Sequence, residues 1–156
     1  MNNVLVGEKD DRVRFSIIRC LDGSEISYAK TVEEFKKKMV EYNPNIIIVN
    51  QEMCEGDLLG YIKQEAKNDI ALIIMTEENI TSIEIANFIK NGAVYIIRNP
   101  FHEEELKQKI NKINELLNTS NYLFGLGERG AKELQLLRNA HQKLRENLME
   151  FKAQAV

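Results

Sequence analysis

The sequence predicts an α/β protein built on one five-stranded, parallel, doubly wound sheet, with helices on both faces and a further helix at the C-terminus. Apolar runs bounded by turn signals alternate five times with segments whose apolar residues recur at helical spacing. The third run, Ile46–Val49, is four consecutive β-branched residues, which is typical of a strand buried on both faces. Strands that alternate with helices join through right-handed crossovers into a parallel sheet.

Each element follows from its local pattern. Gly, Pro or Asn-Gly signals bound the apolar runs, and the helical segments repeat their apolar residues every three or four positions. The expected strands are Val4–Val6, Glu25–Ala29, Ile46–Val49, Ile70–Met75 and Val94–Ile97. The expected helices are Asp11–Cys20, a segment from Thr31 to before Pro44, Leu58–Ala66, a segment from Thr81 to Asn91, and a segment from Glu103 to about Leu117. A doubly wound parallel sheet with helices on both faces is a flavodoxin-like arrangement.

Helix starts and stops are also marked in the sequence. Capping boxes open the second and fourth helices, at Thr31–Glu34 and Thr81–Glu84, because a Thr hydroxyl and a Glu carboxylate three residues later satisfy free backbone N–H groups. The second helix is expected to bury Val32, Phe35, Met39 and Val40, and the fourth to bury Ile85, Phe88 and Ile89.

Glycines interrupt the alternation after the fifth helix. We expect residues 1–118 to form the α/β domain, residues 119–130 a linker containing Gly125, Gly127 and Gly130, and residues 131–156 a C-terminal helix. Apolar residues in that helix alternate at spacings of three and four, which predicts a short coiled-coil seam that either pairs with a second copy or connects the domain to an effector or partner. The seam residues are Leu134, Leu137, His141, Leu144, Leu148 and Phe151.

Composition limits the classes of function. The chain has 156 residues, a net charge of −3 and 44% apolar residues, so it can build a full core but lacks the basic surface of a nucleic-acid binder. The two cysteines, Cys20 and Cys54, do not have the spacing of a metal site. No apolar run is long enough to span a bilayer, so we expect a cytoplasmic protein without membrane or nucleic-acid contacts.

Polar residues at the strand ends mark the candidate site. Ligands bind open α/β sheets at the carboxyl ends of central strands. The central strand ends at Asn50, the fourth at Thr76, and the first and fifth are followed by Glu8-Lys9 and by Asn99-Pro100-Phe101.

These landmarks resemble the receiver domain of bacterial two-component response regulators, over residues 3–118. The resemblance implies a pocket in which two acidic residues and an aspartate bind Mg²⁺, the aspartate accepts a phosphoryl group, and a Ser or Thr and a Lys contact it. By position the pocket falls on Glu8, Lys9, Asn50, Thr76 and Asn99. Only Glu8 and Thr76 keep a suitable residue type, so the chain resembles a degenerate receiver, or pseudo-receiver.

The changes in residue type argue against phosphoryl chemistry. Mg²⁺ requires oxygen ligands, chiefly carboxylates, whereas the charges of Glu8 and Lys9 cancel and Asn50 is neutral. An amide is a poor nucleophile, and without a metal the charge of a transferring phosphoryl group is not neutralised. We therefore expect no metal, no cofactor and no enzymatic activity. One hypothesis places the ammonium group of Lys9 at the metal position, paired with Glu8 and hydrogen-bonded to Asn50.

Two other acidic features leave an alternative open. Asp10 and Asp11 are best interpreted as the cap and first turn of the first helix. Asp57 is interpreted as the cap of the third helix, although as a displaced carboxylate it would make the chain a conventional phospho-accepting receiver.

The resemblance also implies an output surface on the fourth helix, fifth strand and fifth helix. The residues expected there are Phe88, Tyr95, Ile96 and Phe101. The favoured function is phosphorylation-independent signal transduction, in which this surface or the C-terminal helix binds a protein partner, an effector domain or a second copy.

Overall fold

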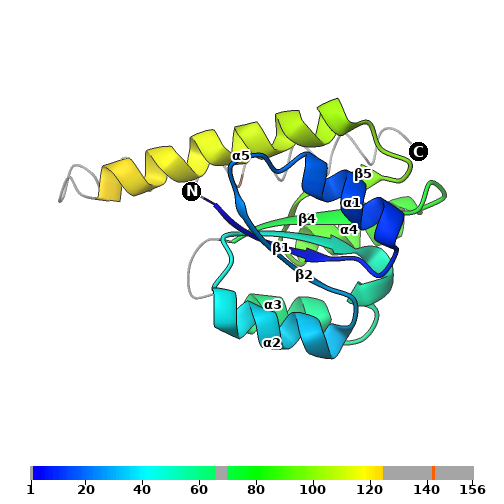
Figure 1. Cartoon of the computed structure of the whole chain (residues 1–156). Helices are drawn as coiled ribbons and strands as arrows, with labels where there is room; N and C mark the ends of the chain where they lie inside the picture. Colours follow the sequence, from blue (N-terminus) through cyan, green and yellow to red (C-terminus); the bar gives the residue numbers. More distant parts are fainter. Residues whose placement is uncertain (1, 66–69, 125–141, 143–156) are drawn as a thin grey trace.

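The computed structural model describes residues 2–65, 70–124 and 142. Five parallel strands form one sheet in the order β2-β1-β3-β4-β5 (Figure 1). The first two strands are added in one direction, and the chain then passes β1 and adds β3, β4 and β5 on its other side. The predicted flavodoxin-like, doubly wound sheet is therefore confirmed. The strands are β1 (Asn3–Gly7), β2 (Glu25–Ala29), β3 (Ile46–Asn50), β4 (Ala71–Thr76) and β5 (Ala93–Arg98).

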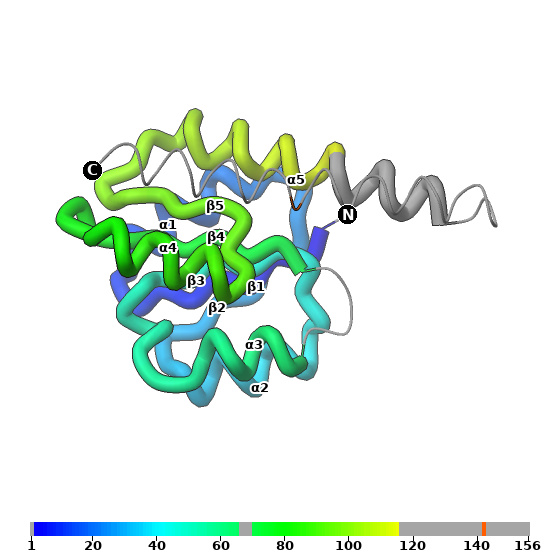
Figure 2. The backbone as a smooth tube through the Cα atoms, turned by 180° about the vertical axis from the view of Figure 1, so that it is seen from behind, coloured from blue at the N-terminus to red at the C-terminus, as the bar shows by residue number. Residues whose placement is uncertain are grey.

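Helices cover both faces of the sheet. Helices α1 and α5 lie on one side, and α2 and α3 lie on the other (Figures 1 and 2). Residues of α4 share a core cluster with those of α2 and α3. The helices are α1 (Asp11–Arg19), α2 (Val32–Tyr42), α3 (Leu58–Glu65), α4 (Ser82–Lys90) and α5 (Glu103–Phe124), and a 3₁₀ turn, η1 (Gln51–Cys54), follows β3.

The central strand β3 contributes to two hydrophobic cores. Ile47 and Val49 pack with α2, α3 and α4, whereas Ile46 and Ile48 pack with α1 and α5, and all four are fully buried. Alternate side chains of a strand point to opposite faces, so an unbroken apolar run supplies both cores.

The threonine half of each predicted capping box forms, whereas the glutamate carboxylates accept from other groups than predicted, from the Lys30 backbone N–H and from the Thr81 hydroxyl. The Thr31 and Thr81 hydroxyls accept the backbone N–H of Glu34 and Glu84, each at 3.2 Å. The Asp10 carboxylate accepts the N–H groups of Arg12 and Val13, which confirms that Asp10 caps α1. These bonds fix where α1, α2 and α4 begin, and so position the loops at the carboxyl edge of the sheet.

Two sequence predictions were wrong. Val40 is 65% exposed, because the buried positions of α2 are Phe35 and Met39 and the next residue is turned away from the sheet. Helix α5 runs to Phe124, six residues into the predicted linker, because no glycine or proline occurs before Gly125.

The other predicted C-terminal features lie almost wholly outside the described residues. The glycine-containing part of the linker and the seam from Leu134 to Phe151 fall there. Gln142, the one described residue of that segment, is helical and exposed. In the described part of the chain, no helix is long and apolar enough to cross a membrane.

Candidate functional site

The polar strand ends meet at the carboxyl edge of the sheet. Glu8 directly follows β1, Asn50 ends β3, Thr76 ends β4, and Asn99 directly follows β5. The strand registers pair Gly7 with Val49, Asn50 with Met75, and Thr76 with Arg98, so these ends lie at similar heights. The parallel sheet thus brings the predicted residues to one edge, as expected.

A hydrogen bond between Glu8 and Asn50 lies at the centre of this edge. The Asn50 side-chain amide donates to Oε2 of Glu8 at 2.7 Å, and the backbone N–H of Asp10 donates to Oε1 at 3.1 Å. Glu8 is only 3% exposed. Both oxygens of a buried carboxylate are therefore engaged within the protein, as burial of a charge requires.

Gly7 allows β1 to come close to its neighbours just before this pair. A Cβ atom at position 7 would lie 2.9 Å from Cγ2 of Val49 and 3.0 Å from the ring of Phe35. Real side chains do not tolerate such contacts without a shift of the neighbours. The absence of a side chain at Gly7 thus helps to set the separation of Glu8 from Asn50.

Lys9 does not occupy the metal position. Its ammonium group pairs with the Glu52 carboxylate at 3.8 Å, and the two side chains are 73% and 55% exposed. The hypothesis that Lys9 pairs with Glu8 is therefore wrong. Glu8 already has two hydrogen-bond donors, and an exposed ammonium group keeps its hydration, which burial beside Glu8 would remove.

The buried cation near this edge is Arg14, which the sequence analysis did not single out. Its guanidinium donates to the Glu8 carbonyl at 3.2 Å and to Asp11 at 2.5 Å, and it lies 4.7 Å from the centre of the Tyr28 ring. Arg14 is 7% exposed. Its position between Val13 and Ile17, three residues after an acidic residue, was the available signal.

Asp11 belongs to the same charged group. Its carboxylate pairs with Arg14 and, at 3.6 Å, with Lys30. Hydrogen bonding to Arg14, followed by the charges of Lys30 and Arg14, lowers the pKa of Asp11. As predicted, Asp11 serves the first turn of α1 and not the Glu8–Asn50 pair.

Thr76 and Asn99 lie apart from Glu8 and Asn50 in their contacts. Thr76 is 1% exposed, and its hydroxyl has no hydrogen-bond partner among the described residues. The backbone N–H of Asn99 donates to the Thr76 carbonyl at 2.8 Å. This bond joins the ends of β4 and β5 but leaves the Thr76 hydroxyl free.

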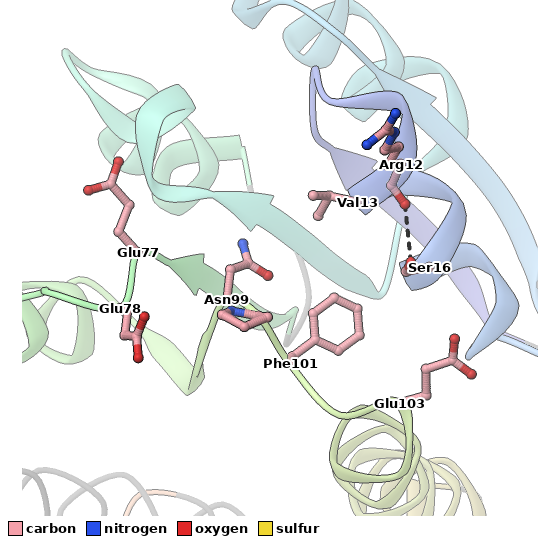
Figure 3. Close-up of a pocket in the computed structure, with 9 residues that line it drawn as sticks. Arg12, Val13, Ser16, Glu77, Glu78, Asn99, Phe101 and Glu103 are labelled. Carbon is pink, nitrogen blue, oxygen red and sulfur yellow. Dashed lines mark hydrogen bonds between the residues drawn. The ribbon is translucent and has the colours of Figure 1, made fainter.

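Two separate cavities divide the predicted pocket. Glu8, Lys9 and Asn50 line a cavity of about 140 Å³, together with Lys30, Thr31, Val32, Glu52 and Met53. Asn99 lines a larger cavity of about 490 Å³ between α1 and the loops that follow β4 and β5 (Figure 3). Thr76 lines neither cavity. The residues expected to form one pocket are therefore separated, with three at the smaller cavity, Asn99 at the larger one and Thr76 at neither.

The donor atoms at Glu8 and Asn50 do not fit Mg²⁺. A magnesium site needs several oxygen ligands free to coordinate it, whereas this edge has one carboxylate with both oxygens engaged and an amide whose N–H group faces it. Within the described ranges, no three His, Cys, Asp or Glu side chains cluster as metal ligands would.

Asp57 does not compensate for the missing carboxylate in this structure. Its side chain is 84% exposed and pairs with Lys36 at 3.3 Å. It does not line the cavity beside Asn50. The side-chain cap predicted for α3 is also missing, since only the Asp57 backbone carbonyl bonds to the helix, at Tyr61 N–H.

Cys54 lies beneath the turn that follows Asn50. Its thiol donates to the Asn50 carbonyl over 3.7 Å, and burial raises the pKa of Cys54 to about 12. A thiol with so high a pKa stays protonated and is a weak nucleophile at neutral pH. Cys54 therefore helps to fill the core under η1. The sequence predicted a loop at this position, whereas the structure has the 3₁₀ turn η1.

Two of the four expected output residues are core residues. Tyr95 is 5% and Ile96 is 4% exposed, because helices cover β5 on both faces, while Phe88 and Phe101 are half-buried. Burial raises the pKa of Tyr95, and the Lys109 ammonium group lies 4.5 Å from the centre of its ring. The prediction that Tyr95 and Ile96 are presented at a surface is wrong for this structure.

This chain is similar to known proteins in its structure and not measurably in its sequence. No protein-family model and no curated protein matches the sequence. The chain is similar to a response regulator from Thermotoga maritima, with 22% identity and a TM-score of 0.64 over 72% of this chain and 97% of that one.

Two further similar structures belong to the same group of proteins. A DNA-binding response regulator of the LuxR family from Staphylococcus aureus shares 24% identity, with a TM-score of 0.62 over 73% of this chain and 99% of that one. The chemotaxis response regulator CheY4 of Vibrio cholerae shares 18% identity, with a TM-score of 0.61 over 72% and 98%. The described α/β domain therefore has the receiver-domain fold of response regulators.

Proposed function

We propose that this chain is a response-regulator receiver domain of the degenerate type, which transmits a signal by binding a protein partner and does not accept a phosphoryl group. The hydrogen bond of 2.7 Å between Glu8 and Asn50 is the observation that carries the proposal. It lies at the position where the resemblance to receivers implies a metal ion between carboxylates.

The chemistry of this edge supports the proposal. An aspartyl phosphate forms on a carboxylate and not on an amide, and transfer of a phosphoryl group needs a cation to neutralise the developing charge. The nearby cations already have anionic partners, since Lys9 pairs with Glu52, and Lys30 and Arg14 both pair with Asp11. The resemblance to receivers implies a lysine at position 99, but this chain has the uncharged Asn99 there.

The output of such a domain depends on its partner. Phosphorylation ordinarily shifts the population between two shapes of a receiver. A pocket closed by Glu8 and Asn50 favours one shape, so the partner's concentration sets the signal. We propose an effector domain or another protein as the partner, and a second copy through residues 131–156 as the route to a dimer.

The test is exposure of the 156-residue chain to acetyl phosphate and Mg²⁺, followed by intact-mass measurement. We expect no mass gain corresponding to a phosphoryl group. Beryllofluoride with Mg²⁺ gives a second measurement, in which backbone amide NMR signals of Glu8 and Asn50 should not shift.

An Asp57→Asn variant identifies the alternative. A stoichiometric mass gain in the parent that disappears in this variant would replace the proposal with a conventional phospho-accepting receiver that uses a displaced carboxylate. A gain that persists in the variant would place the adduct elsewhere and would equally reject the proposal.

A further inference from the structure

Another cavity lies at the edge of the sheet where the strands begin, opposite the carboxyl edge. It holds about 310 Å³ and is formed by the first residues of β1, by β2 and by the end of α2. It shares no lining residue with the cavities of about 140 and 490 Å³ at the carboxyl edge. Its size is at the lower end of the range, about 300 to 1,000 Å³, of pockets that bind small molecules.

Polar side chains stand on the floor of this cavity, on the face of the sheet that α2 covers (Figures 1 and 2). Leu5 and Ala29 belong to the core cluster that contains the buried residues of α2. Alternate residues of a strand point to the same face, so Asn3, Glu25 and Ser27 lie on this face too. The strand beginnings therefore supply a carboxamide, a carboxylate and a hydroxyl, each with an oxygen that can accept a hydrogen bond.

The end of α2 adds a negative electrostatic potential. Pro44 has no N–H group, and the N–H of Asn45 donates to the Asn3 carbonyl at 2.9 Å, so neither residue continues the hydrogen bonds of the helix. The last carbonyls of α2 therefore keep the partial negative charge of a helix C-terminus, and no basic side chain stands in its last turn. Since Tyr42 and Pro44 line the cavity, this charge lies beside it.

Glu25 supplies a full negative charge. Its side chain is exposed and forms no ion pair with any other residue that the structure describes. None of the residues that line the cavity, all of them described, is a lysine, an arginine or a histidine. The face of an aromatic ring also attracts positive charge, so the ring of Tyr42, which is 52% exposed, favours the same kind of ligand. The carboxylate, the helix end and the ring thus all favour a cation.

We propose that this cavity binds a small organic amine, in which an ammonium group is attached to a short apolar body. The ammonium group would pair with the Glu25 carboxylate and donate to the side-chain oxygen of Asn3 or Ser27. The apolar body would contact the rings of Tyr42 and Pro44. This inference goes beyond the proposed function and does not depend on it, because the cavity lies at the other edge of the sheet from the Glu8–Asn50 pair.

The test is an NMR titration of the isotope-labelled 156-residue chain with three compounds of similar shape. Phenethylamine is protonated at neutral pH, as a lysine side chain is, whereas phenethyl alcohol is neutral and phenylpropionate is negative. We expect phenethylamine to shift the backbone amide signals of Asn3, Glu25 and Ser27 in a saturable manner. Phenethyl alcohol should bind about tenfold more weakly, since it lacks a charged hydrogen-bond donor, and phenylpropionate should not bind.

A matched pair of variants locates the ammonium group. Glu25→Gln keeps the shape of the side chain and removes its charge, so it should weaken phenethylamine about tenfold, which corresponds to about 1.4 kcal/mol. Glu33→Gln makes the same charge change at an exposed position in the first turn of α2, away from the cavity, and should leave the affinity unchanged. Equal weakening in the two variants would overturn the proposal, since the amine would then respond only to the net charge of the protein.

Two substitutions of Tyr42 test the aromatic contact. Tyr42→Leu should weaken phenethylamine about threefold, whereas Tyr42→Phe keeps the ring and should preserve the affinity. The absence of a saturable shift with phenethylamine would overturn the proposal. Equal affinity for the amine and the alcohol would also overturn it, because the cavity would then recognise only the apolar body. None of these results involves phosphoryl transfer, so each leaves the mass test of the proposed function unaffected.

Discussion

The two halves of the carboxyl edge differ in how fully their polar groups are satisfied. Beside β1 and β3, Glu8 and Asn50 bond to each other and the adjoining cavity holds about 140 Å³. Beside β4 and β5, the Thr76 hydroxyl is unpaired among the described residues and the adjoining cavity holds about 490 Å³. The polar groups of the first half are satisfied within the protein, whereas the second half keeps an unpaired hydroxyl and a larger cavity.

Under the proposed function, this difference would let the receiver fold act without phosphoryl transfer. Replacing a carboxylate by an amide converts repulsion between two acids into a hydrogen bond, so no ion is needed to hold the loops. The strand ends remain in place.

The largest effect is expected from Asn50→Asp. The substitution places two carboxylates where an N–H···O bond of 2.7 Å now lies, and Glu8 is buried. We expect the free energy of unfolding to fall by about 3 kcal/mol at pH 7, because a buried charge loses its donor and gains a like charge. Urea unfolding monitored by circular dichroism measures this change.

The pH dependence of this variant has a defined sign. Repulsion raises the pKa of one carboxyl in the folded state, so the loss of stability grows as pH rises through the unfolded value of about 4. The deficit should therefore shrink at pH 3. Asn111→Asp, on the exposed side of α5, is the control and should change stability by less than about 0.5 kcal/mol. Equal stability of the two variants at pH 7 would show that the Glu8–Asn50 bond does not hold this edge.

The next effect distinguishes the two cations near Glu8. Arg14→Met keeps an apolar stem but removes the bonds to the Glu8 carbonyl and to Asp11, and should cost about 2 kcal/mol. Lys9→Met removes only an exposed ion pair of 3.8 Å and should cost less than about 1 kcal/mol. Thermal and urea unfolding of both variants would decide this, and a larger loss for Lys9→Met would reverse the assignment of the buried cation.

The fold was predictable because backbone patterns report it directly. Each of these signals determines the backbone conformation of residues only a few positions away. Examples are the unbroken run Ile46–Val49, the caps at Thr31 and Thr81, and the glycine after Asn91. The end of α5 was misplaced, since the polar residues from Asn118 to Asn121 are weak helix formers but not breakers.

The site was only partly predictable because it depends on side-chain direction. The sequence places Glu8 and Asn50 at neighbouring strand ends, but it does not say that Lys9 turns outward to Glu52 or that Arg14 turns inward. Tyr95 and Ile96 illustrate the same limit, because cover by helices on both faces of β5 is a tertiary effect.

A smaller effect is expected at alkaline pH from Cys54, whose thiol lies beside Asn50 at the end of β3. Burial raises the pKa of this thiol from 9.0 to about 12, so the unfolded chain loses the proton first as pH rises. Above pH 9 the thiol should therefore reduce the free energy of unfolding by at most about 1.4 kcal/mol per pH unit. Comparing Cys54→Ala with the parent in urea at pH 8 and pH 10 tests this, and an identical loss of stability in both proteins would contradict the burial of the thiol.

The smallest effect is expected at Thr76, in the half of the carboxyl edge beside β4 and β5. Thr76→Val replaces a buried, unpartnered hydroxyl by a methyl group of similar shape, so the free energy of unfolding should stay the same or rise by up to about 1 kcal/mol. The same substitution at Thr81 removes the bond that caps α4 and should lower it by about 1 kcal/mol. Urea unfolding of both variants compares one exchange in two settings. If Thr76→Val were instead the more destabilising change, the Thr76 hydroxyl would have a partner in solution, and the two halves of the edge would be alike in how their polar groups are satisfied.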